Sequence, residues 1–334
     1  MLLTWLQFVL CLALITWAGQ RLSFYGGIIA EEMGLSLTWV GLILISSVTS
    51  LPELATGLSS VIAADSPNIA VGDVLGSCVF NLALIVILDF LLRKESVYTR
   101  AHIGHALSAG FGVVLIGFVG SSILLSQAGM MWSLGHIGLY SPLILVFYAL
   151  AIRTLFRYEQ AQPLPMTKRE VRKHGVSLNQ AKLGYAMAAL IVILAGSWLP
   201  FVGKEIAQAM GWGESFVGTL LIAMVTSLPE TVVTIFALRL GAIDMALGNL
   251  LGSNLFNVAI LALDDLAYLP GPLLSTVSPA HIISALSAMM MSGIAIIGLF
   301  YRPQKRLLMG VGWLSLFLLS IYFINSFAIY LHGQ

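Results

Sequence analysis

The string Val-Thr-Ser-Leu-Pro-Glu occurs twice in this chain, at 48–53 and again at 225–230. Each copy lies inside an otherwise apolar stretch, where a proline interrupts helical hydrogen bonding. An ionisable side chain deep in a membrane-length apolar segment usually marks the path of an ion or substrate. Broken helices at matching positions of two halves point to the binding site of a transporter. The string therefore predicts a membrane protein with a polar site at two helix breaks.

The composition supports a membrane protein and excludes other classes. Hydrophobic residues make up 59% of the 334 residues and charged residues only 9%, whereas a soluble domain carries roughly 25% charged residues. The net charge of +1 says nothing about nucleic acid, but no basic tract is long enough to bind it, so we expect no nucleic-acid partner. No nucleophile motif, phosphate-binding loop or zinc spacing is present, so we expect neither an enzyme nor a cofactor. Cys11 and Cys78 both lie in apolar runs, which argues against a disulfide framework.

The repeated string belongs to a much longer repeat. A shift of 177 positions places Ala18-Gly19 on Ala195-Gly196, and after the glutamates a shift of 176 places Leu75-Gly76-Ser77 on Leu251-Gly252-Ser253. Further along, a shift of 179 places Ala101-His102-Ile103 on Ala280-His281-Ile282. We therefore expect two homologous halves, residues 1–157 and 183–334, joined by a linker at 158–182.

Each half contains five apolar runs of the ~20 residues that are needed to cross a bilayer. The expected helices are 2–31, 37–63, 68–92, 102–126 and 136–157, followed by 183–209, 214–238, 243–269, 279–301 and 306–331. No Lys or Arg precedes the first run, so we expect it to be part of the fold rather than a signal peptide. An odd number of helices per half inserts the halves with opposite orientations. The prediction is an all-α membrane protein of ten transmembrane helices in two inverted-topology five-helix repeats.

Positive charge predicts the orientation in the membrane. The linker carries four closely spaced basic residues, from Lys168 to Lys173, and Arg239 and the turn at 302–306 are also basic. We expect these segments on the cytoplasmic side of the cell membrane, with both termini outside. The loop from Asp264 to Pro279 should also lie outside.

The repeated string has the chemistry of a cation site. Pro52 and Pro229 lack an N–H and free backbone carbonyls nearby, and Thr49 and Glu53 share one helix face. Hydroxyl, carboxylate and carbonyl oxygens are the ligands of hard cations such as Ca²⁺. The pairs Ser77/Asn81 and Ser253/Asn257 are each four residues apart and can complete the site.

A simpler interpretation is that Ser-Leu-Pro-Glu is a capping box, with the serine capping its own helix. One copy alone would not distinguish the two interpretations. Two copies, each followed by Gly-Ser-x-x-Phe-Asn, favour ion binding. The spacing of Gly72 and Gly76 is more typical of close helix packing, and His102 and His281 are interpreted as structural residues at helix starts.

The paired motifs resemble the two alpha repeats of the Na⁺/Ca²⁺ exchanger family, within the Ca²⁺/cation antiporter superfamily, over nearly the whole chain. The resemblance implies a central Ca²⁺ held by Glu53 and Glu230 with backbone oxygens of Thr49 and Thr226. It implies Na⁺ sites that draw on Ser46, Ser50, Ser77, Asn81, Ala223, Ser227, Ser253 and Asn257. It also implies that the first helix of each half slides over the rest as a gate.

Four positions depart from the family pattern. Val48 and Val225 replace a glycine, and Asp73 and Cys78 stand where asparagine is common. Asp73 is either a third carboxylate near the site or a charge at a helix N-terminus, and we favour the latter. Asn81 and Asn257 are amides where some relatives have aspartate, and the Glu-His motifs of the proton-coupled branch are absent.

Three functions remain open on the sequence. The first is exchange of Na⁺ for Ca²⁺. The second is antiport on the same scaffold with H⁺ coupling or another divalent ion, which Asp73 and the two valines motivate. The third is a non-transporting membrane scaffold, which the intact glutamate pair, Glu53 and Glu230, disfavours.

Overall fold

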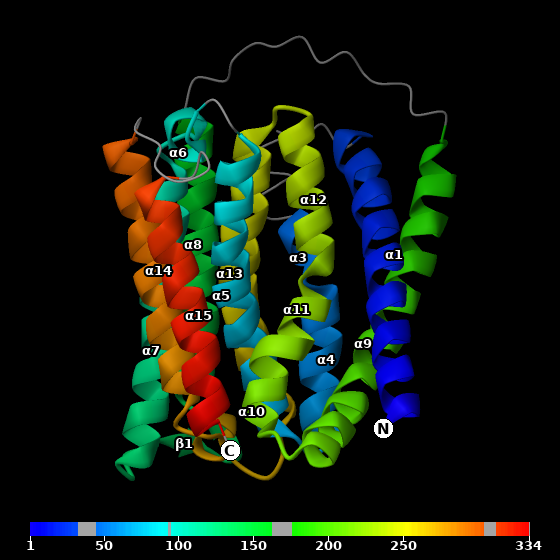
Figure 1. Ribbon diagram of the computed structural model, residues 1–334, viewed down its shortest axis with the longest axis vertical. Coiled ribbons are helices and arrows are strands. Elements are labelled where there is room, and N and C mark those ends of the chain that lie inside the picture. Colours follow the sequence, from blue (N-terminus) through cyan, green and yellow to red (C-terminus); the bar gives the residue numbers. More distant parts are fainter. Residues whose placement is uncertain (33–44, 93–94, 162–175, 304–311, 334) are drawn as a thin grey trace.

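The computed structural model describes residues 1–32, 45–92, 95–161, 176–303 and 312–333 (Figure 1). Within these residues, eight helices are long and apolar enough to cross a membrane. They are α1 (Leu2–Glu32), α5 (Pro67–Leu91), α7 (His105–Gln127), α8 (Tyr140–Ala161), α9 (Leu178–Met210), α13 (Ile243–Ala267), α14 (His281–Tyr301) and α15 (Trp313–His332). The predicted all-α membrane fold is confirmed.

Two further segments are broken helices that contain the repeated string. In the first half, α3 (Ser46–Thr49) is followed by α4 (Leu51–Ile62). In the second half, α10 (Glu214–Phe216), the π-helix η2 (Val217–Ile222) and α11 (Ala223–Thr226) are followed by α12 (Leu228–Arg239), with a bend of 44° at the break. The first part of the predicted helix 37–63 lies outside the described residues, so the count of ten spans is not tested there.

Both breaks occur at the same serine of the string and have the same backbone geometry. Ser50 has φ −86° and ψ 13°, and Ser227 has φ −84° and ψ 8°. Each break precedes a proline in the first turn of the next helix, where the missing N–H costs no helical hydrogen bond. The prolines thus start new helices instead of kinking continuous ones.

Several predicted boundaries were wrong. α8 continues to Ala161 and α9 begins at Leu178, so the helices take residues from both ends of the predicted linker at 158–182. Ser177 and Gln180 form a capping box that starts α9 earlier than its apolar run suggests. Asp264 and Asp265, predicted to open an outside loop, lie fully buried in the last turns of α13.

The remaining elements are short. They are α6 (Val97–Arg100), the 3-10 turn η3 (Leu273–Ser275) and an antiparallel hairpin of β1 (Ser133–Leu134) and β2 (Ile137–Gly138), which pairs Ser133 with Gly138 and Leu134 with Ile137.

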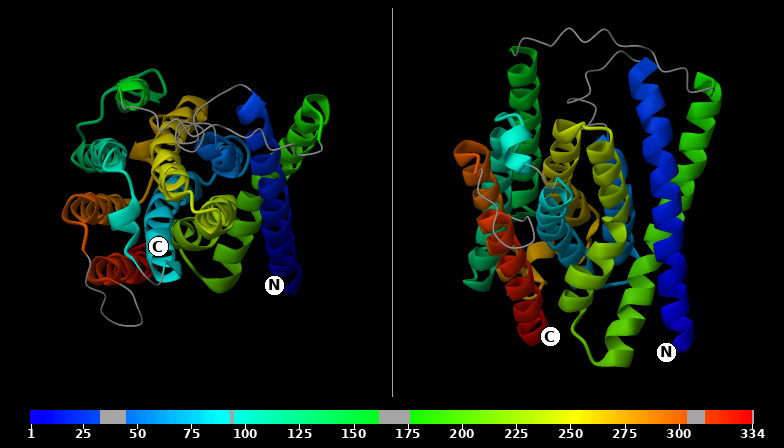
Figure 2. Two further views of the ribbon diagram at one scale, coloured as in Figure 1. Left: turned by 90° about the horizontal axis from the view of Figure 1, so that it is seen from above. Right: turned by 45° about the horizontal axis from the view of Figure 1, so that its top comes forward.

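The two halves run through the molecule in opposite directions. Both termini lie at one end, whereas α8 ends and α9 begins at the other end (Figure 1). α1 and α9 pack along each other at one side of the bundle, and α5 and α13 lie in its middle (Figure 2). We call the two ends the terminus end and the linker end.

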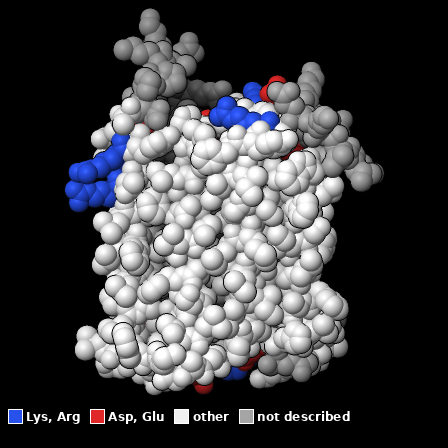
Figure 3. Space-filling view, turned by 90° about the vertical axis from the view of Figure 1, so that its left-hand side faces the viewer, with Lys and Arg blue, Asp and Glu red and all other residues white. Residues whose placement is uncertain are grey.

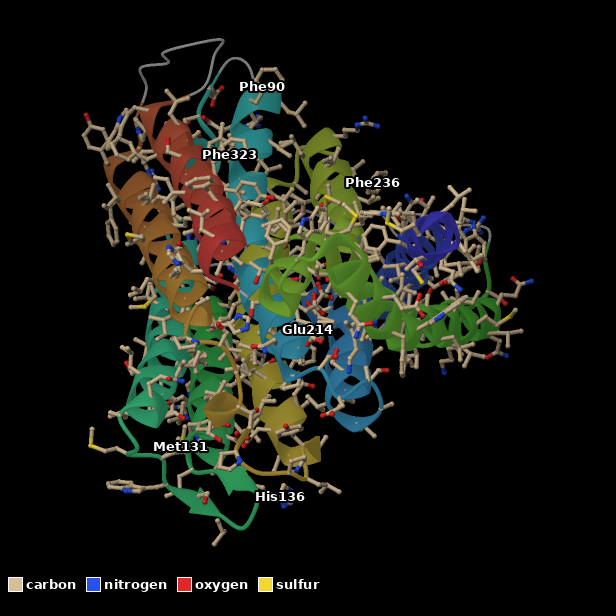
Figure 4. All side chains as sticks on the ribbon, turned by 60° about the horizontal axis from the view of Figure 1, so that its bottom comes forward. Phe90, Met131, His136, Glu214, Phe236 and Phe323 are labelled. Carbon is tan, nitrogen blue, oxygen red and sulfur yellow. The ribbon has the colours of Figure 1, made fainter. Side chains whose placement is uncertain are left out.

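The outer surface has the character of a lipid-facing protein. Figure 3 shows a wide band without charge, with Lys and Arg mostly at the linker end. Phe90, Phe236 and Phe323 point outward from the bundle (Figure 4) and are largely exposed. An exposed apolar surface of this extent fits an integral, multi-pass membrane protein.

The structural repeat has a different register from the sequence match at its fourth helix. α7 begins at His105 and α14 at His281, a shift of 176 rather than 179. His105 Nε2 lies 3.1 Å from Asp244 Oδ1, and His281 Nε2 lies 3.2 Å from Asn68 Oδ1. The structural counterpart of His281 is therefore His105, and the pairing with His102 was wrong.

A pair of buried aspartates at this same shift joins the two halves to each other. Asp265 accepts hydrogen bonds from Gly138 N, Ser141 Oγ, Tyr140 Oη and Leu273 N. Asp89 accepts them from Ser96 Oγ, Val97 N, Gly312 N and Ser315 Oγ. Each carboxylate joins the end of its own half's third helix to the start of the other half's fifth helix.

Candidate cation site

The serines at the two breaks each reach the glutamate of the other half. Ser50 Oγ donates to Glu230 Oε1 at 3.0 Å, and Ser227 Oγ donates to Glu53 Oε1 at 3.1 Å. All four side chains are fully buried. The two copies of the string, 177 residues apart, thus form one site in the middle of the bundle.

The capping-box interpretation is wrong for both copies. Neither Ser50 nor Ser227 makes a side-chain cap to its own helix. Each hydroxyl is instead donated across the molecule, so the motif builds a shared site rather than a helix start.

A second serine from the neighbouring long helix completes the donors on each glutamate. Ser77 Oγ of α5 donates to Glu53 Oε1 at 3.4 Å, and Ser253 Oγ of α13 donates to Glu230 Oε1 at 3.3 Å. The other carboxylate oxygen, Oε2, of both glutamates is buried without a hydrogen-bond donor among the described residues. A buried carboxylate oxygen needs a partner, and a bound cation supplies one.

The threonines of the string place backbone oxygens at the edge of this site. Thr49 Oγ1 donates to Ser46 O at 3.2 Å and to Asn249 Oδ1 at 3.3 Å. Thr226 Oγ1 donates to Ala223 O at 3.2 Å and to Asp73 Oδ1 at 2.8 Å. The carbonyls of Ser46 and Ala223 therefore lie beside the hydroxyls, but each also accepts a backbone N–H, from Ser50 and Ser227, so the prolines do not free them.

The two predicted asparagines lie outside this hydroxyl–glutamate network. Asn81 Nδ2 donates to Asn254 Oδ1 at 3.1 Å, while Asn81 Oδ1 has no donor among the described residues. Both amide atoms of Asn257 are also buried without a described partner. Their amide oxygens remain free to contact a cation. Asn249 and Asn254 were missed, because their bonding to Thr49 and Asn81 crosses between halves and leaves no local sequence signal.

Asp73 belongs to the site, and the expectation of a helix N-terminal charge was wrong. It lies in the second turn of α5, is fully buried and accepts the hydrogen bond from Thr226. Its repeat counterpart, Asn249, makes the equivalent bond with Thr49. The site thus contains three carboxylates, those of Glu53, Glu230 and Asp73, and its two halves differ by one charge.

The long helices α1 and α9 pack directly on the two breaks. A Cβ at Gly19 of α1 would lie 2.7 Å from Pro229 Cβ, and a Cβ at Gly196 of α9 would lie 3.1 Å from Pro52 O. Each glycine therefore contacts the proline of the other half's string, or lies beside it. Gly72 and Gly76 similarly allow α5 to approach η2, where a Cβ at Gly72 would lie 3.0 Å from Thr219 N.

Within the described residues, no three His, Cys, Asp or Glu side chains are grouped as metal ligands. A cation here must take a mixed set of carboxylate, hydroxyl, amide and carbonyl oxygens. Such all-oxygen sets suit hard ions such as Ca²⁺ and Na⁺ rather than zinc.

Comparison with known proteins places the chain in a family. The sequence model described as sodium/calcium exchanger protein matches residues 3–151 and 181–330. The chain belongs to the sodium/calcium exchanger protein family. The chain is also 28% identical to the inner membrane protein YrbG of Escherichia coli over 269 residues, which cover 78% of each protein.

Two solved exchanger structures share the fold. The sodium-calcium exchanger NCX_Mj is 21% identical, with a TM-score of 0.62 over 96% of this chain and 97% of that one. The H⁺/Ca²⁺ exchanger CAX is 14% identical, with a TM-score of 0.71 over 99% of this chain and 86% of that one. The family scaffold is thus common to structures named for Na⁺ and for H⁺ exchange.

Proposed function

We propose that this chain is a secondary antiporter that exchanges Na⁺ for Ca²⁺ across the membrane by alternating access. The observation that carries this is the crossed pairing of Ser50 with Glu230 and of Ser227 with Glu53. It gathers two carboxylates from opposite halves and leaves one oxygen of each without a donor among the described residues. One Ca²⁺ bound between them matches their two negative charges.

The ligands divide by oxygen type. Glu53 and Glu230, with backbone oxygens of Thr49 and Thr226, would hold Ca²⁺. The Na⁺ ligands would come from the surrounding hydroxyl, amide and carbonyl oxygens, those of Ser46, Ser50, Ser77, Asn81, Ala223, Ser227, Ser253 and Asn257. These residues come from both halves, so a movement of one half against the other would change the site.

α1 and α9 are the expected moving elements. Gly19 lies against Pro229, and Gly196 lies beside Pro52, at the breaks that carry the glutamates. Sliding of these two helices would therefore act directly on the site. The proposal includes two repeats, 1–157 and 183–334, with the linker end in the cytoplasm and both termini outside the cell membrane.

One observation favours a second candidate, antiport coupled to H⁺. Asp73 places a third buried carboxylate beside Thr226, where its repeat counterpart is the neutral Asn249. Such a group can take up a proton in place of Na⁺. No observation favours a non-transporting scaffold.

Ion flux in proteoliposomes tests these functions. Uptake of ⁴⁵Ca²⁺ is measured with an outward Na⁺ gradient at equal pH, and separately with a pH gradient in the absence of Na⁺. We expect uptake in the first condition only. Uptake that follows pH and ignores Na⁺ would select the second candidate, and no uptake in either condition would reject Ca²⁺ exchange.

A further inference from the structure

Asp264 is a buried carboxylate that the fold does not require. Its side chain is fully buried near the end of α13, and neither carboxylate oxygen has a hydrogen-bond donor among the described residues. The adjacent Asp265 accepts four hydrogen bonds. At the structural shift of 176, the counterpart of Asp265 is Asp89, whereas that of Asp264 is Leu88, which is also buried. The first half thus builds the same helix turn with an apolar side chain in place of Asp264.

Asp264 lies on the same side of α13 as the cation site. Ser253, Asn257 and Asp264 are separated by four and seven residues, and these spacings place all three on one helix face. Asp264 is about 10 Å along the helix axis from Asn257, in the direction of the terminus end. It is therefore displaced from the site along the line that a cation would follow to that end.

The side chain is aimed at the helix that carries Glu53. A Cβ at Gly57 of α4 would lie 2.7 Å from Asp264 Oδ1. Gly57 is one helical turn beyond Glu53 on the same face, and only a glycine leaves room for the carboxylate there. Asp264 thus occupies the contact between α4 and α13, one turn outward from the central glutamate.

The electrostatics of this position favour a cation. An ionised carboxylate without a donor or counter-charge is strongly disfavoured in a protein interior. No described Lys or Arg forms an ion pair with Asp264. A passing cation would supply the missing partner.

We propose that Asp264 forms an outer cation-binding position, between the central site and the terminus end, at which a hard cation pairs with its carboxylate. We call this position the waypoint. This waypoint rests on the proposed cation exchange and deepens it. Because Leu88 stands at the equivalent position of the other half, the described part of α5 has no such carboxylate at the matching point toward the linker end. The two faces of the protein therefore present different affinities to the same ion.

The test measures ⁴⁵Ca²⁺ uptake against Ca²⁺ concentration in sealed vesicles of known orientation, which is read from a protease-accessible C-terminal tag. D264N keeps the shape of the side chain, and D264L installs the residue of the other half. We expect either change to raise the half-saturating Ca²⁺ concentration roughly tenfold at the terminus end, because a focusing charge is lost. The value at the linker end should not change.

Two control variants separate this effect from others. E205Q removes an exposed acid of α9 and should leave both values unchanged. D265N replaces one of two carboxylate oxygens, each of which accepts two hydrogen bonds, and should lower the melting temperature of the purified protein, whereas D264N should not. Equal shifts at both faces, or a lower melting temperature for D264N, would mark Asp264 as structural and overturn the waypoint.

Ca²⁺ uptake by the wild type shows whether a negative result concerns the waypoint or the proposed function. If the wild type takes up Ca²⁺ and the half-saturating Ca²⁺ concentrations of D264N and D264L equal that of the wild type, the waypoint alone is overturned. An absence of Ca²⁺ uptake by the wild type would overturn the exchange of Ca²⁺ and the waypoint with it.

Discussion

At the scale of single residues, the two glutamates carry equal parts of one site. Each has one oxygen occupied by two serine hydroxyls and one oxygen without a described donor. We expect either E53Q or E230Q to abolish Ca²⁺ transport, because each removes half of the charge that the two glutamates present to the ion. ⁴⁵Ca²⁺ uptake is the measurement, with E205Q as the control for an acid at the surface. Wild-type uptake by either folded variant would contradict the assignment of the site.

The crossed serines give a second prediction. A hydrogen bond to a charged group contributes about 1.5–3 kcal/mol, so S50A or S227A should weaken Ca²⁺ affinity by roughly one to two orders of magnitude. The two variants should behave alike, because each serine donates to one glutamate of the opposite half. S320A removes an exposed hydroxyl of α15 that bonds only within its own helix and should have no effect. A defect in only one of the two serine variants would contradict a symmetric site.

The sequence identified most of the residues at this scale, but not their contacts. The duplicated string singled out Glu53 and Glu230 because a charge in an apolar segment is visible without a structure. The hydrogen bond from Ser50 to Glu230 of the other half was not visible, since a local capping box explains the same residues. Asp73 was misjudged for a related reason: distance from a helix start is uncertain by a few residues, and burial depends on the neighbouring η2 and α11.

At the scale of whole elements, α1 is held on α12 by a glycine–proline contact. G19A would place a Cβ 2.7 Å from Pro229 Cβ, and such overpacking costs about 1–3 kcal/mol. We expect G19A to lower both the melting temperature and the rate of transport. G27A is the matched control on the same helix, because a Cβ there has nothing within 4 Å. Equal behaviour of the two variants would show that the contact does not matter.

Helix positions were predictable, whereas their ends and the fourth-helix register were not. Apolar runs locate spans well because the bilayer demands length. Asp264 and Asp265 were assigned to an outside loop because they resemble loop residues when their buried environment is not known. The shift of 179 was suggested by two short identities, but the buried positions of α7 and α14 follow 176. Packing preserves helix faces, and a few identical letters can match by chance.

At the scale of the whole molecule, the opposite directions of the two halves predict the topology. A cysteine introduced at Lys168 should react with a membrane-impermeant thiol reagent only from the cytoplasmic side, and cysteines at Leu2 and Gly333 only from outside. The native Cys11 and Cys78 are buried, so the background should be low. Labelling of the two termini from different sides would contradict the inverted arrangement.

The three central carboxylates also bear on the charge that each exchange cycle moves. Glu53, Glu230 and Asp73 together can be neutralised by three monovalent cations, whereas one Ca²⁺ brings two charges. Exchange of three Na⁺ for one Ca²⁺ moves one net charge across the membrane. The membrane potential should then bias the exchange by about 2.3 kcal/mol per 100 mV. That free energy corresponds to roughly a 50-fold change in the Ca²⁺ gradient at equilibrium.

The measurement is Na⁺-driven ⁴⁵Ca²⁺ flux in sealed vesicles, with the potential set by valinomycin and K⁺ gradients. We expect the membrane potential to speed Ca²⁺ flux in one direction and to slow it in the other in the wild type. D73N leaves two carboxylates and makes the two halves alike at this position, where the second half has Asn249, so its flux should depend less on the potential. Na⁺-driven flux that is indifferent to potential in the wild type would contradict net charge movement but leave Na⁺ coupling intact. An unchanged potential dependence in D73N would instead show that Asp73 does not set the number of Na⁺ ions.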